Sequence, residues 1–332
     1  MSCNLNLSQD HDGRRLDRTL RSLWPEVPLS AIMRALRKGE VRLNSARVRE
    51  PGTRVSAGQS LYVPWEAPGT PSEERPARRG TVPILWRGER ALIVNKPADL
   101  LVQPDVKGGD SVITRVWAMM EGEAASGSHS PGYRPAAVHR LDRNTTGVLA
   151  VALRGDALRA LEALFKERRV SKRYLAIVVG CAPDSSKLKS HGDAWEVDAP
   201  LLKDAEANIV RVSREGQSAR TRCRRLAGGG ELSLMSVELL TGRTHQARVH
   251  LAHIGCPILG DRKYGSFEAN RRWKGQAKRP MLHAFELEFP ASLPPALSEL
   301  AGRTFRAPLP EDMQKIIEGM GNDVLRLEVG QV

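Results

Sequence analysis

Cysteine and aromatic residues are scarce in this chain of 332 residues, with four cysteines and 5% Phe, Trp and Tyr. Cys3, Cys181, Cys223 and Cys256 are far apart and form no CxxC pair, which argues against a disulfide framework or a zinc site of the usual spacing and favours a reducing compartment. No apolar run approaches the roughly 18 residues of a membrane span, and the N-terminus lacks the apolar core of a signal peptide. We therefore expect a soluble, cytoplasmic protein.

Positive charge is the feature in excess. The chain has 51 Lys and Arg against 38 Asp and Glu, a net charge of +13 that is not confined to a tail. Such a surplus favours a polyanionic partner, nucleic acid above all. The 41% hydrophobic content can build a real core, and the length exceeds that of a typical single domain. One large domain with a smaller appendage is therefore expected.

The smaller appendage is predicted at residues 14–64. Leucines at helical spacing predict a first helix, and a second helix is expected with its N-cap at Ser30 and its C-cap at Gly39. Short strands are expected at 41–44 and 61–63, separated by Pro-Gly and Ala-Gly turns. The segment thus predicts a compact helix-and-strand module.

This module carries seven basic side chains between residues 30 and 54 against two acids, a candidate phosphate-facing patch. The segment LSAIMRALRKGEVRLNSARV resembles an S4 RNA-binding domain, a small α/β module. The resemblance implies that RNA is bound by Arg34, Arg37, Lys38, Arg42, Arg47 and Arg49. Residues 65–81, rich in Pro, Gly and charge, are interpreted as a linker that tethers the module to the next domain.

Residues 82–310 alternate apolar segments with turns and a few helices, which predicts a large α+β domain. Strands are expected at 91–95, 147–153, 174–179, 232–240 and 285–289, and helices at 113–120, 157–167 and near 245–254. Residues 121–135 and 181–194 are interpreted as surface loops. Residues 311–332 are predicted to form a C-terminal helix and tail.

The most informative segment is VHRLDRNTTGVL, residues 138–149, which places Asp142 in a polar turn beside Arg140 and Arg143. A buried strand follows the turn, and a strand anchored in a core is a rigid mount for a reactive group. The segment resembles the HRLDxxTSG signature of the RluA-type pseudouridine synthases, in which this Asp is catalytic. Thr146 replaces the usual Ser and keeps the hydroxyl.

Further segments resemble the same family in the same order. They are NKPADL, which has Asp99 in place of Gly, SKRYLAIVVG, LTGRTHQARVH, ILGDRKYG and MLHA. By this resemblance the ring of Tyr174 lies against the target uracil, replacing the stacking that a base loses when it leaves its helix. Arg248 is the basic partner that keeps Asp142 ionised. Leu282 forms the apolar floor opposite the tyrosine.

The resemblance also implies that the substrate is bound by His139, Arg140, Arg243, His245 and Gln246. Histidines 245, 250 and 253 suggest a metal site, but no carboxylate or cysteine stands at ligand spacing with them. The family uses neither metal nor cofactor, so none is expected. The implied fold is a mixed, largely antiparallel central sheet with flanking helices.

The implied reaction is an isomerisation that breaks the N1–C1′ bond of a uridine, turns the base and rejoins it through C5. The segment APLLKDAEANIVRVSREGQSARTRCRRL brings the chain nearest to the RluC branch, which acts on large-subunit (23S) ribosomal RNA. That RNA is the expected partner, and a monomer is the expected state. The alternatives are a transfer RNA pseudouridine synthase of the same family and a catalytically silent RNA-binding or ribosome-assembly protein. A nucleic-acid glycosidase or hydrolase that uses Asp142 would normally need a second carboxylate, and the matched motifs contain none for that role.

Overall fold

The computed structural model describes residues 2–24, 27–66, 80–105, 109–123, 134–180, 187–191, 194–204 and 206–320. Most of the predicted linker at 65–81, most of the predicted loop at 121–135 and the tail after residue 320 lie outside these ranges. No helix within the described residues has the length and apolarity needed to cross a membrane.

The N-terminal unit, residues 2–24 and 27–66, combines two helices with a four-stranded antiparallel sheet of order β1-β4-β2-β3. Its elements are β1 (Cys3–Asn6), η1 (Gln9–His11), α1 (Leu16–Leu23), α2 (Leu29–Lys38), β2 (Arg42–Leu43), β3 (Ala46–Arg47) and β4 (Ser60–Val63). The unit has a hydrophobic core of its own, built around Trp24 and Leu61. Strand β1 lies upstream of residue 14, where the sequence analysis begins this module.

Helix α2 begins two positions earlier than predicted. Pro28, not Ser30, is the N-cap, because its extended backbone (φ −57°, ψ 143°) lets its carbonyl accept the first bonds from Ala31 and Ile32. The predicted C-cap is confirmed: Gly39 has φ 68°, a left-handed conformation that glycine adopts without a side-chain penalty.

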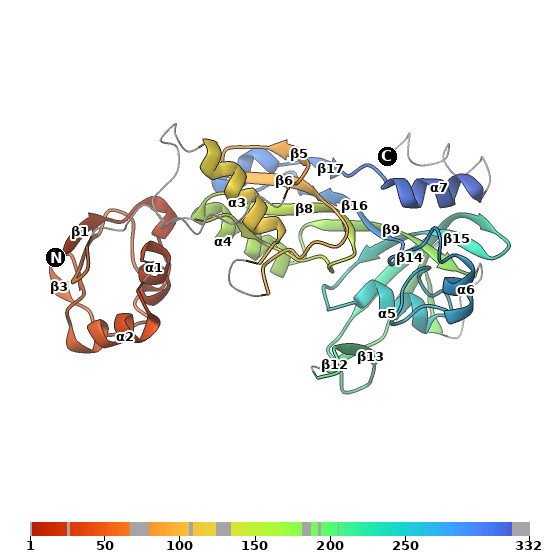
Figure 1. Cartoon of the computed structure of the whole chain (residues 1–332), viewed down its shortest axis with the longest axis horizontal. Coiled ribbons are helices and arrows are strands. Elements are labelled where there is room, and N and C mark those ends of the chain that lie inside the picture. Colours follow the sequence, from red (N-terminus) through yellow and green to blue (C-terminus); the bar gives the residue numbers. More distant parts are fainter. Residues whose placement is uncertain are drawn as a thin grey trace.

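The C-terminal unit, residues 80–320, is built on a sheet of eleven described strands of order β10-β11-β14-β15-β9-β16-β8-β6-β5, with β17 added to β16 and β7 to β8. Only β16 and β8 pair in parallel, and all other pairs are antiparallel. The predicted α+β class with a mixed, largely antiparallel sheet is confirmed (Figure 1).

All five predicted strands of this sheet are present, and they are its central members together with β14. They are β6 (Ala91–Lys96), β8 (Thr146–Ala152), β9 (Ser171–Val179), β15 (Leu232–Leu239) and β16 (Leu282–Glu288). The remaining strands are β5 (Ile84–Arg87), β7 (Ala136–Ala137), β10 (Lys189–His191), β11 (Ala194–Asp198), β14 (Arg220–Gly229) and β17 (Thr304–Arg306). A separate hairpin joins β12 (Leu201–Asp204) to β13 (Ile209–Val212).

The helices lie around this sheet (Figure 1). They are α3 (Val112–Glu123), α4 (Gly155–Lys166), α5 (Gln246–His253), α6 (Phe267–Arg272), η4 (Pro295–Leu300) and α7 (Glu311–Gly319). Helix α7 lies in the segment predicted as a C-terminal helix and tail, and its Met313, Ile316 and Ile317 are buried in the largest of the three hydrophobic clusters described for this unit. The predicted loop at 181–194 was also wrong in part, because residues 189–191 form β10.

The basic segment at 271–274 is engaged internally. Trp273 packs against the core and its indole N–H donates to Glu231 at 3.4 Å, while Arg272 forms an ion pair with the same carboxylate. The indole ring of Trp273 is therefore partly covered by the rest of the protein.

The two units touch through η1. The backbone N–H of Gly155, at the start of α4, donates to the carboxylate of Asp10 at 3.0 Å, and Arg154 approaches the same carboxylate at 3.5 Å. Asp10 is only 4% exposed, so this polar contact is largely shielded from water. The N-terminal unit extends from this point at one end of the elongated molecule (Figure 1).

Candidate active site

Asp142 lies in the turn between β7 and β8, at a cavity of about 1570 Å³. Strand β8 is buried along its whole length between β6 and β16, so the turn before it has a fixed base. Gly147 in this strand approaches the Ala284 carbonyl so closely that a Cβ atom would stand 2.1 Å from its oxygen. The predicted rigid mount for Asp142 is thus built from two central strands.

The turn is held from below by Lys96, the last residue of β6. Its ammonium group donates to the carbonyl oxygens of Pro97 (2.8 Å), Leu100 (2.7 Å) and Arg143 (2.8 Å), and the residue is fully buried. Burial lowers the pKa of Lys96 to about 7. Lys96 therefore joins the loop after β6 to the turn that carries Asp142.

Arg248 on α5 is the basic partner of Asp142. Its Nη1 donates to Oδ2 of Asp142 at 3.0 Å, and its Nε and Nη2 donate to the two carboxylate oxygens of Asp261 at 2.7 and 2.8 Å. Burial alone would raise the pKa of Asp261, but the bonds and charge of Arg248 outweigh it and lower that pKa. The bidentate pair with Asp261 fixes the guanidinium plane, so the third nitrogen of the guanidinium, Nη1, is directed at Asp142.

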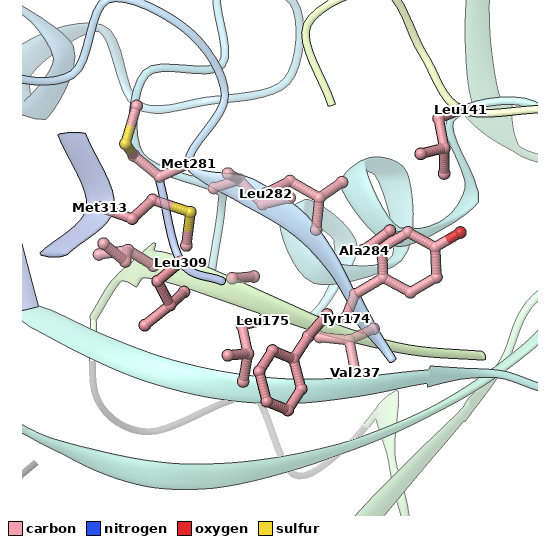
Figure 2. Close-up of a cluster of buried hydrophobic side chains, with 14 of the residues drawn as sticks. Leu141, Tyr174, Leu175, Val237, Met281, Leu282, Ala284, Leu309 and Met313 are labelled. Carbon is pink, nitrogen blue, oxygen red and sulfur yellow. The ribbon is translucent and has the colours of Figure 1, made fainter. Parts of the chain in front are cut away.

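Tyr174 on β9 lies at the apolar side of the cavity, 6% exposed. Figure 2 shows its ring beside Ala284, within the buried cluster that also holds Leu282. Burial, and then the charge of Asp142, raise the pKa of Tyr174, so its phenol stays neutral at physiological pH. Leu282 is 3% exposed and supports this cluster; the residues that line the cavity do not include it.

His245 and Tyr264 complete the polar side of the site. His245 precedes α5, and its Nε2 stands 3.9 Å from Oδ2 of Asp142. Its Nδ1 forms a hydrogen bond of 2.8 Å with the hydroxyl of Tyr264. The ring of Tyr264 lies 5.1 Å from the guanidinium carbon of Arg248, close enough for a cation–π contact.

Two predicted substrate-binding residues are engaged inside the protein. His139 accepts a hydrogen bond from the backbone N–H of Ala150 at 3.1 Å and stacks on Phe165, and burial lowers its pKa to about 3. The Gln246 amide accepts from Thr241 and from the backbone of Arg243, and donates to the Arg220 carbonyl and to the Thr221 hydroxyl. Both residues shape the wall of the site through the backbone.

The two arginines predicted to bind the substrate, Arg140 and Arg243, lie at the rim of the cavity. Arg140 is exposed, and the Nε of Arg243 donates to the Ser218 carbonyl at 3.1 Å. Basic residues outnumber acidic ones along the lining, and a polyanion is therefore attracted to the opening. The basic lining residues are Arg140, Arg143, Lys166, Arg168, Lys172, Lys203, Arg243, Arg248, Arg262, Lys263, Lys278 and Arg279.

The sequence analysis missed four residues that support the site: Lys96, Asp261, Tyr264 and Arg279. Arg279 pairs with Asp312 of α7 at 2.7 Å and donates to the carbonyl of Asn144, two residues beyond Asp142, at 3.3 Å. The signal for Asp261 and Tyr264 was present in the ILGDRKYG segment, which resembles the family, although no role was predicted for either residue. Their partners come from other elements, which the sequence does not place beside them.

The histidines considered for a metal site have other partners. The ring of His250 bonds to the Thr221 hydroxyl and to the Ala199 carbonyl, at 2.8 and 2.9 Å. His245 bonds to Tyr264, as described above. Within the described ranges, no three His, Cys, Asp or Glu side chains are grouped as a metal site requires.

Three of the predicted RNA-binding residues, Arg42, Arg47 and Arg49, lie near one another in the N-terminal unit. Arg42 and Arg47 face each other across the β2–β3 hairpin. Arg47 and Arg49 lie over Gly39, where a Cβ atom would come within 3.5 and 3.4 Å of their side chains. The end of α2 and this hairpin thus bring basic side chains together, and all six predicted residues are exposed.

The family model described as RNA pseudouridylate synthase matches residues 90–253. Ribosomal large subunit pseudouridine synthase C of Vibrio cholerae is 36% identical over 310 residues, which cover 87% of this chain and 89% of that protein. The protein of the same description from Escherichia coli K12 is 34% identical over 334 residues, 95% of this chain and 96% of that protein.

A solved structure shares the fold. Human RNA pseudouridylate synthase domain containing 4 superposes with a TM-score of 0.54 at 26% sequence identity, covering 72% of this chain and 92% of that one. The residues matched by the family model include Asp142, Tyr174 and Arg248, and all three line the same cavity. The chain therefore belongs to the RNA pseudouridine synthase family, whose members are isomerases.

Proposed function

We propose that this protein converts uridines of large-subunit ribosomal RNA into pseudouridine, with Asp142 as the catalytic residue. The observation that carries the proposal is the 3.0 Å ion pair between Asp142 and Arg248 at a basic cavity that also exposes Tyr174. Relatives matched over 95% of the chain are described as ribosomal large subunit pseudouridine synthases. The alternative target, transfer RNA, is an arm of the test below.

The chemistry follows from the positions of three side chains. A uridine inside a helix cannot reach Asp142, so the base leaves its stack and enters the cavity. The ring of Tyr174 offers it an aromatic face, and Arg248 donates a hydrogen bond to the Asp142 carboxylate, which lies next to the ribose. The N1–C1′ bond breaks, the uracil turns, and C5 bonds to C1′. The C5 proton leaves and N1 gains one, so the reaction needs no oxidant or reductant.

The N-terminal unit supplies RNA affinity in this proposal. Its exposed basic residues at the end of α2 and on the β2–β3 hairpin contact phosphates, and residues 14–64 act as an S4-like RNA-binding domain. Tethered to the C-terminal unit, which extends over residues 82–310 and is completed by α7, it raises the local concentration of RNA at the cavity.

We also propose that the protein acts as a monomer in the cytoplasm. Large exposed apolar side chains among the described residues are Leu29, Ile84, Ile209 and Phe267, and they belong to four separate elements. Isolated side chains of this kind do not form the contiguous patch of a stable dimer. Light scattering of the purified protein at working concentration should give the mass of one chain.

Pseudouridine mapping tests the activity, the catalytic residue and the target together. Large-subunit ribosomal RNA transcript and bulk transfer RNA are each incubated with the wild-type protein and with Asp142→Asn. New pseudouridines in the ribosomal transcript with the wild type alone would support the proposal. Conversion only in transfer RNA would overturn the target and keep the chemistry. RNA binding without conversion in either would instead support the silent RNA-binding alternative.

A further inference from the structure

His245 is held in a backbone conformation that its residue type rarely adopts. Its φ is +54° and its ψ is +17°, in the left-handed region, at the position just before α5. A non-glycine residue there carries an energetic cost, which persists only where the surrounding structure imposes it. Its side chain does not cap the helix. The imidazole is instead directed to the cavity between Tyr264 and Asp142.

Tyr264 determines which ring nitrogen of His245 carries the proton. The Tyr264 hydroxyl accepts a hydrogen bond from the backbone N–H of Val210 at 2.9 Å. The Val210 N–H group can only donate, so the arrangement that also uses the phenol proton has Tyr264 donating to the second partner, Nδ1 of His245 at 2.8 Å. Nδ1 then accepts, and the proton of the neutral imidazole sits on Nε2. Burial lowers the pKa of His245, which favours this neutral form.

The resulting Nε2–H group faces the catalytic carboxylate without bonding to it. Nε2 of His245 and Oδ2 of Asp142 are 3.9 Å apart, longer than a direct hydrogen bond. A group that both accepts and donates, placed about 2.8 Å from each atom, would bond to both. Among the groups of a uridine nucleotide in RNA, the ribose 2′-hydroxyl has this dual capacity.

We propose that His245, oriented by Tyr264, binds the 2′-hydroxyl of the target uridine together with Asp142. The Nε2–H group of His245 donates to the hydroxyl oxygen, and the hydroxyl donates to Oδ2 of Asp142. This contact places the ribose, with its C1′ and C2′, against the catalytic carboxylate and makes the site selective for ribose over deoxyribose. The assignment rests on the proposed function, since it names the part of the substrate that this site holds.

The orientation of His245 is tied to the β12–β13 hairpin. Val210, which bonds to Tyr264, belongs to β13, and Lys203 and Asn208 of the same hairpin line the cavity. The backbone N–H of Tyr264 in turn donates to Asp261 at 3.2 Å, the carboxylate that fixes Arg248. Tyr264 is therefore a positioning residue for both partners of Asp142.

A test combines one change in the substrate with one in the protein. Single-turnover rates are measured on a large-subunit ribosomal RNA fragment that contains a mapped uridine, and on the same fragment with 2′-deoxyuridine at that position. The proteins are wild type, His245→Asn and Tyr264→Phe. Asparagine tolerates the left-handed backbone, and phenylalanine keeps the ring under Arg248. The thermal unfolding temperature of each variant checks that it folds.

The wild type should lose about 100-fold in rate on the deoxy substrate, because two hydrogen bonds disappear, one of them to a charged group. In His245→Asn the loss should shrink to about tenfold, because one of the two bonds is already absent. Tyr264→Phe should fall between them. Since the deoxy sugar itself changes the reaction, only the difference between proteins reports the contact.

Arg211→Gln is the matched control. Arg211 is an exposed cation on β13 that does not line the cavity. Any effect of Arg211→Gln on the single-turnover rate should therefore be the same for both substrates. Ring ¹⁵N shifts of His245, assigned by comparison with His245→Asn, should show an unprotonated Nδ1 in the wild type and a mixture of tautomers in Tyr264→Phe. Equal deoxy penalties in wild type and His245→Asn, or a protonated Nδ1 in the wild type, would overturn the inference. Failure of the wild type to convert the all-ribose fragment would overturn the proposed function instead.

Discussion

The ammonium group of Lys96 donates a hydrogen bond of 2.8 Å to the carbonyl oxygen of Arg143, the residue directly after Asp142. Two further carbonyls, of Pro97 and Leu100, accept from the same nitrogen. Three acceptors match the three N–H groups of an ammonium. The conformation of the catalytic turn thus depends on a side chain that does not line the cavity.

Lys96→Met should therefore impair catalysis without touching substrate. The methionine keeps most of the aliphatic volume but leaves three carbonyl oxygens, that of Leu100 buried, without the ammonium donor, which costs roughly 2–4 kcal/mol of unfolding free energy. Urea unfolding measures that loss. We expect the rate constant of the chemical step to fall much more than RNA affinity does. Unchanged turnover in a folded Lys96→Met protein would show that the turn keeps its shape without this anchor.

Arg248 serves two carboxylates, and a pair of variants separates its roles. Arg248→Met leaves Asp261, which has no exposed surface, as an unpaired buried charge, at a cost of roughly 3–5 kcal/mol. Adding Asp261→Asn removes that charge and should restore much of the unfolding free energy. Activity should stay lost in the double variant, since Asp142 still lacks its partner. Recovery of both stability and activity would show that Arg248 has only a structural role.

The sequence was most informative where one residue's environment is local. Asp142 could be placed on a rigid mount because the apolar run that forms β8 follows it directly. The partners of Lys96 and Tyr264 were not predictable, because they are backbone groups from distant segments: Arg143 for the first, Val210 for the second. The same is true of His139, whose motif letter suggested substrate contact while its imidazole accepts from the Ala150 backbone.

Missed strands have a related cause. Strands β10, β12, β13 and β17 have three or four residues each and carry polar or charged side chains. Short strands of this kind are stabilised by pairing with a neighbouring strand. Their sequences are too short and too polar for a hydrophobic alternation to predict them. Helix α7 was recognised as a helix, but the Arg279–Asp312 pair that joins it to the site was not predictable, because the two residues are 33 positions apart.

Thr146, the residue that departs from the family signature, keeps the function of the hydroxyl. Its Oγ1 lies 2.8 Å from Nδ1 of His283, whose Nε2 lies 3.2 Å from the Ala307 carbonyl. Since Nε2–H donates to that carbonyl, the threonine hydroxyl donates to Nδ1. Thr146→Ser should change unfolding free energy by less than about 1 kcal/mol. Thr146→Val leaves Nδ1 without a donor and should cost about 1–3 kcal/mol, measured by denaturant titration.

His283 predicts a loss of stability in mild acid. Burial is the main cause that lowers its pKa from 6.5 to about 4. Between these values the unfolded chain binds a proton that the folded protein does not. The contribution of neutral His283 to the unfolding free energy is therefore complete above pH 6.5. It declines as the pH falls to 4 and levels off below that pH, and the total loss is about 3 kcal/mol.

Unfolding free energy against pH, compared between wild type and His283→Gln, checks this prediction. His139, whose pKa is lowered to about 3, adds a similar decline to both proteins and cancels in the difference. Between pH 4 and 6.5 the slope of unfolding free energy against pH should be steeper in the wild type than in the variant. The difference corresponds to about one more proton bound on unfolding. Parallel curves would mean that His283 is protonated equally in the folded and unfolded chains.

The basic face of the N-terminal unit should set RNA affinity and leave the chemical step alone. Arg42 and Arg47 are exposed and opposite each other on the β2–β3 hairpin, distant in the sequence from every residue that lines the cavity. If each contacts one phosphate, Arg42→Gln combined with Arg47→Gln removes about two units from the slope of log affinity against log salt concentration. The rate at saturating RNA should match the wild type.

Lys315→Gln is the matched control for this prediction, because Lys315 is an exposed cation on α7 that pairs with Glu311 at 2.6 Å. It removes one positive charge from the protein without touching the N-terminal unit, so its salt slope should stay at the wild-type value. An equal loss of affinity in Lys315→Gln would mean that net charge alone attracts the RNA. A reduced rate at saturation in the double arginine variant would mean that the N-terminal unit also positions the target uridine in the cavity.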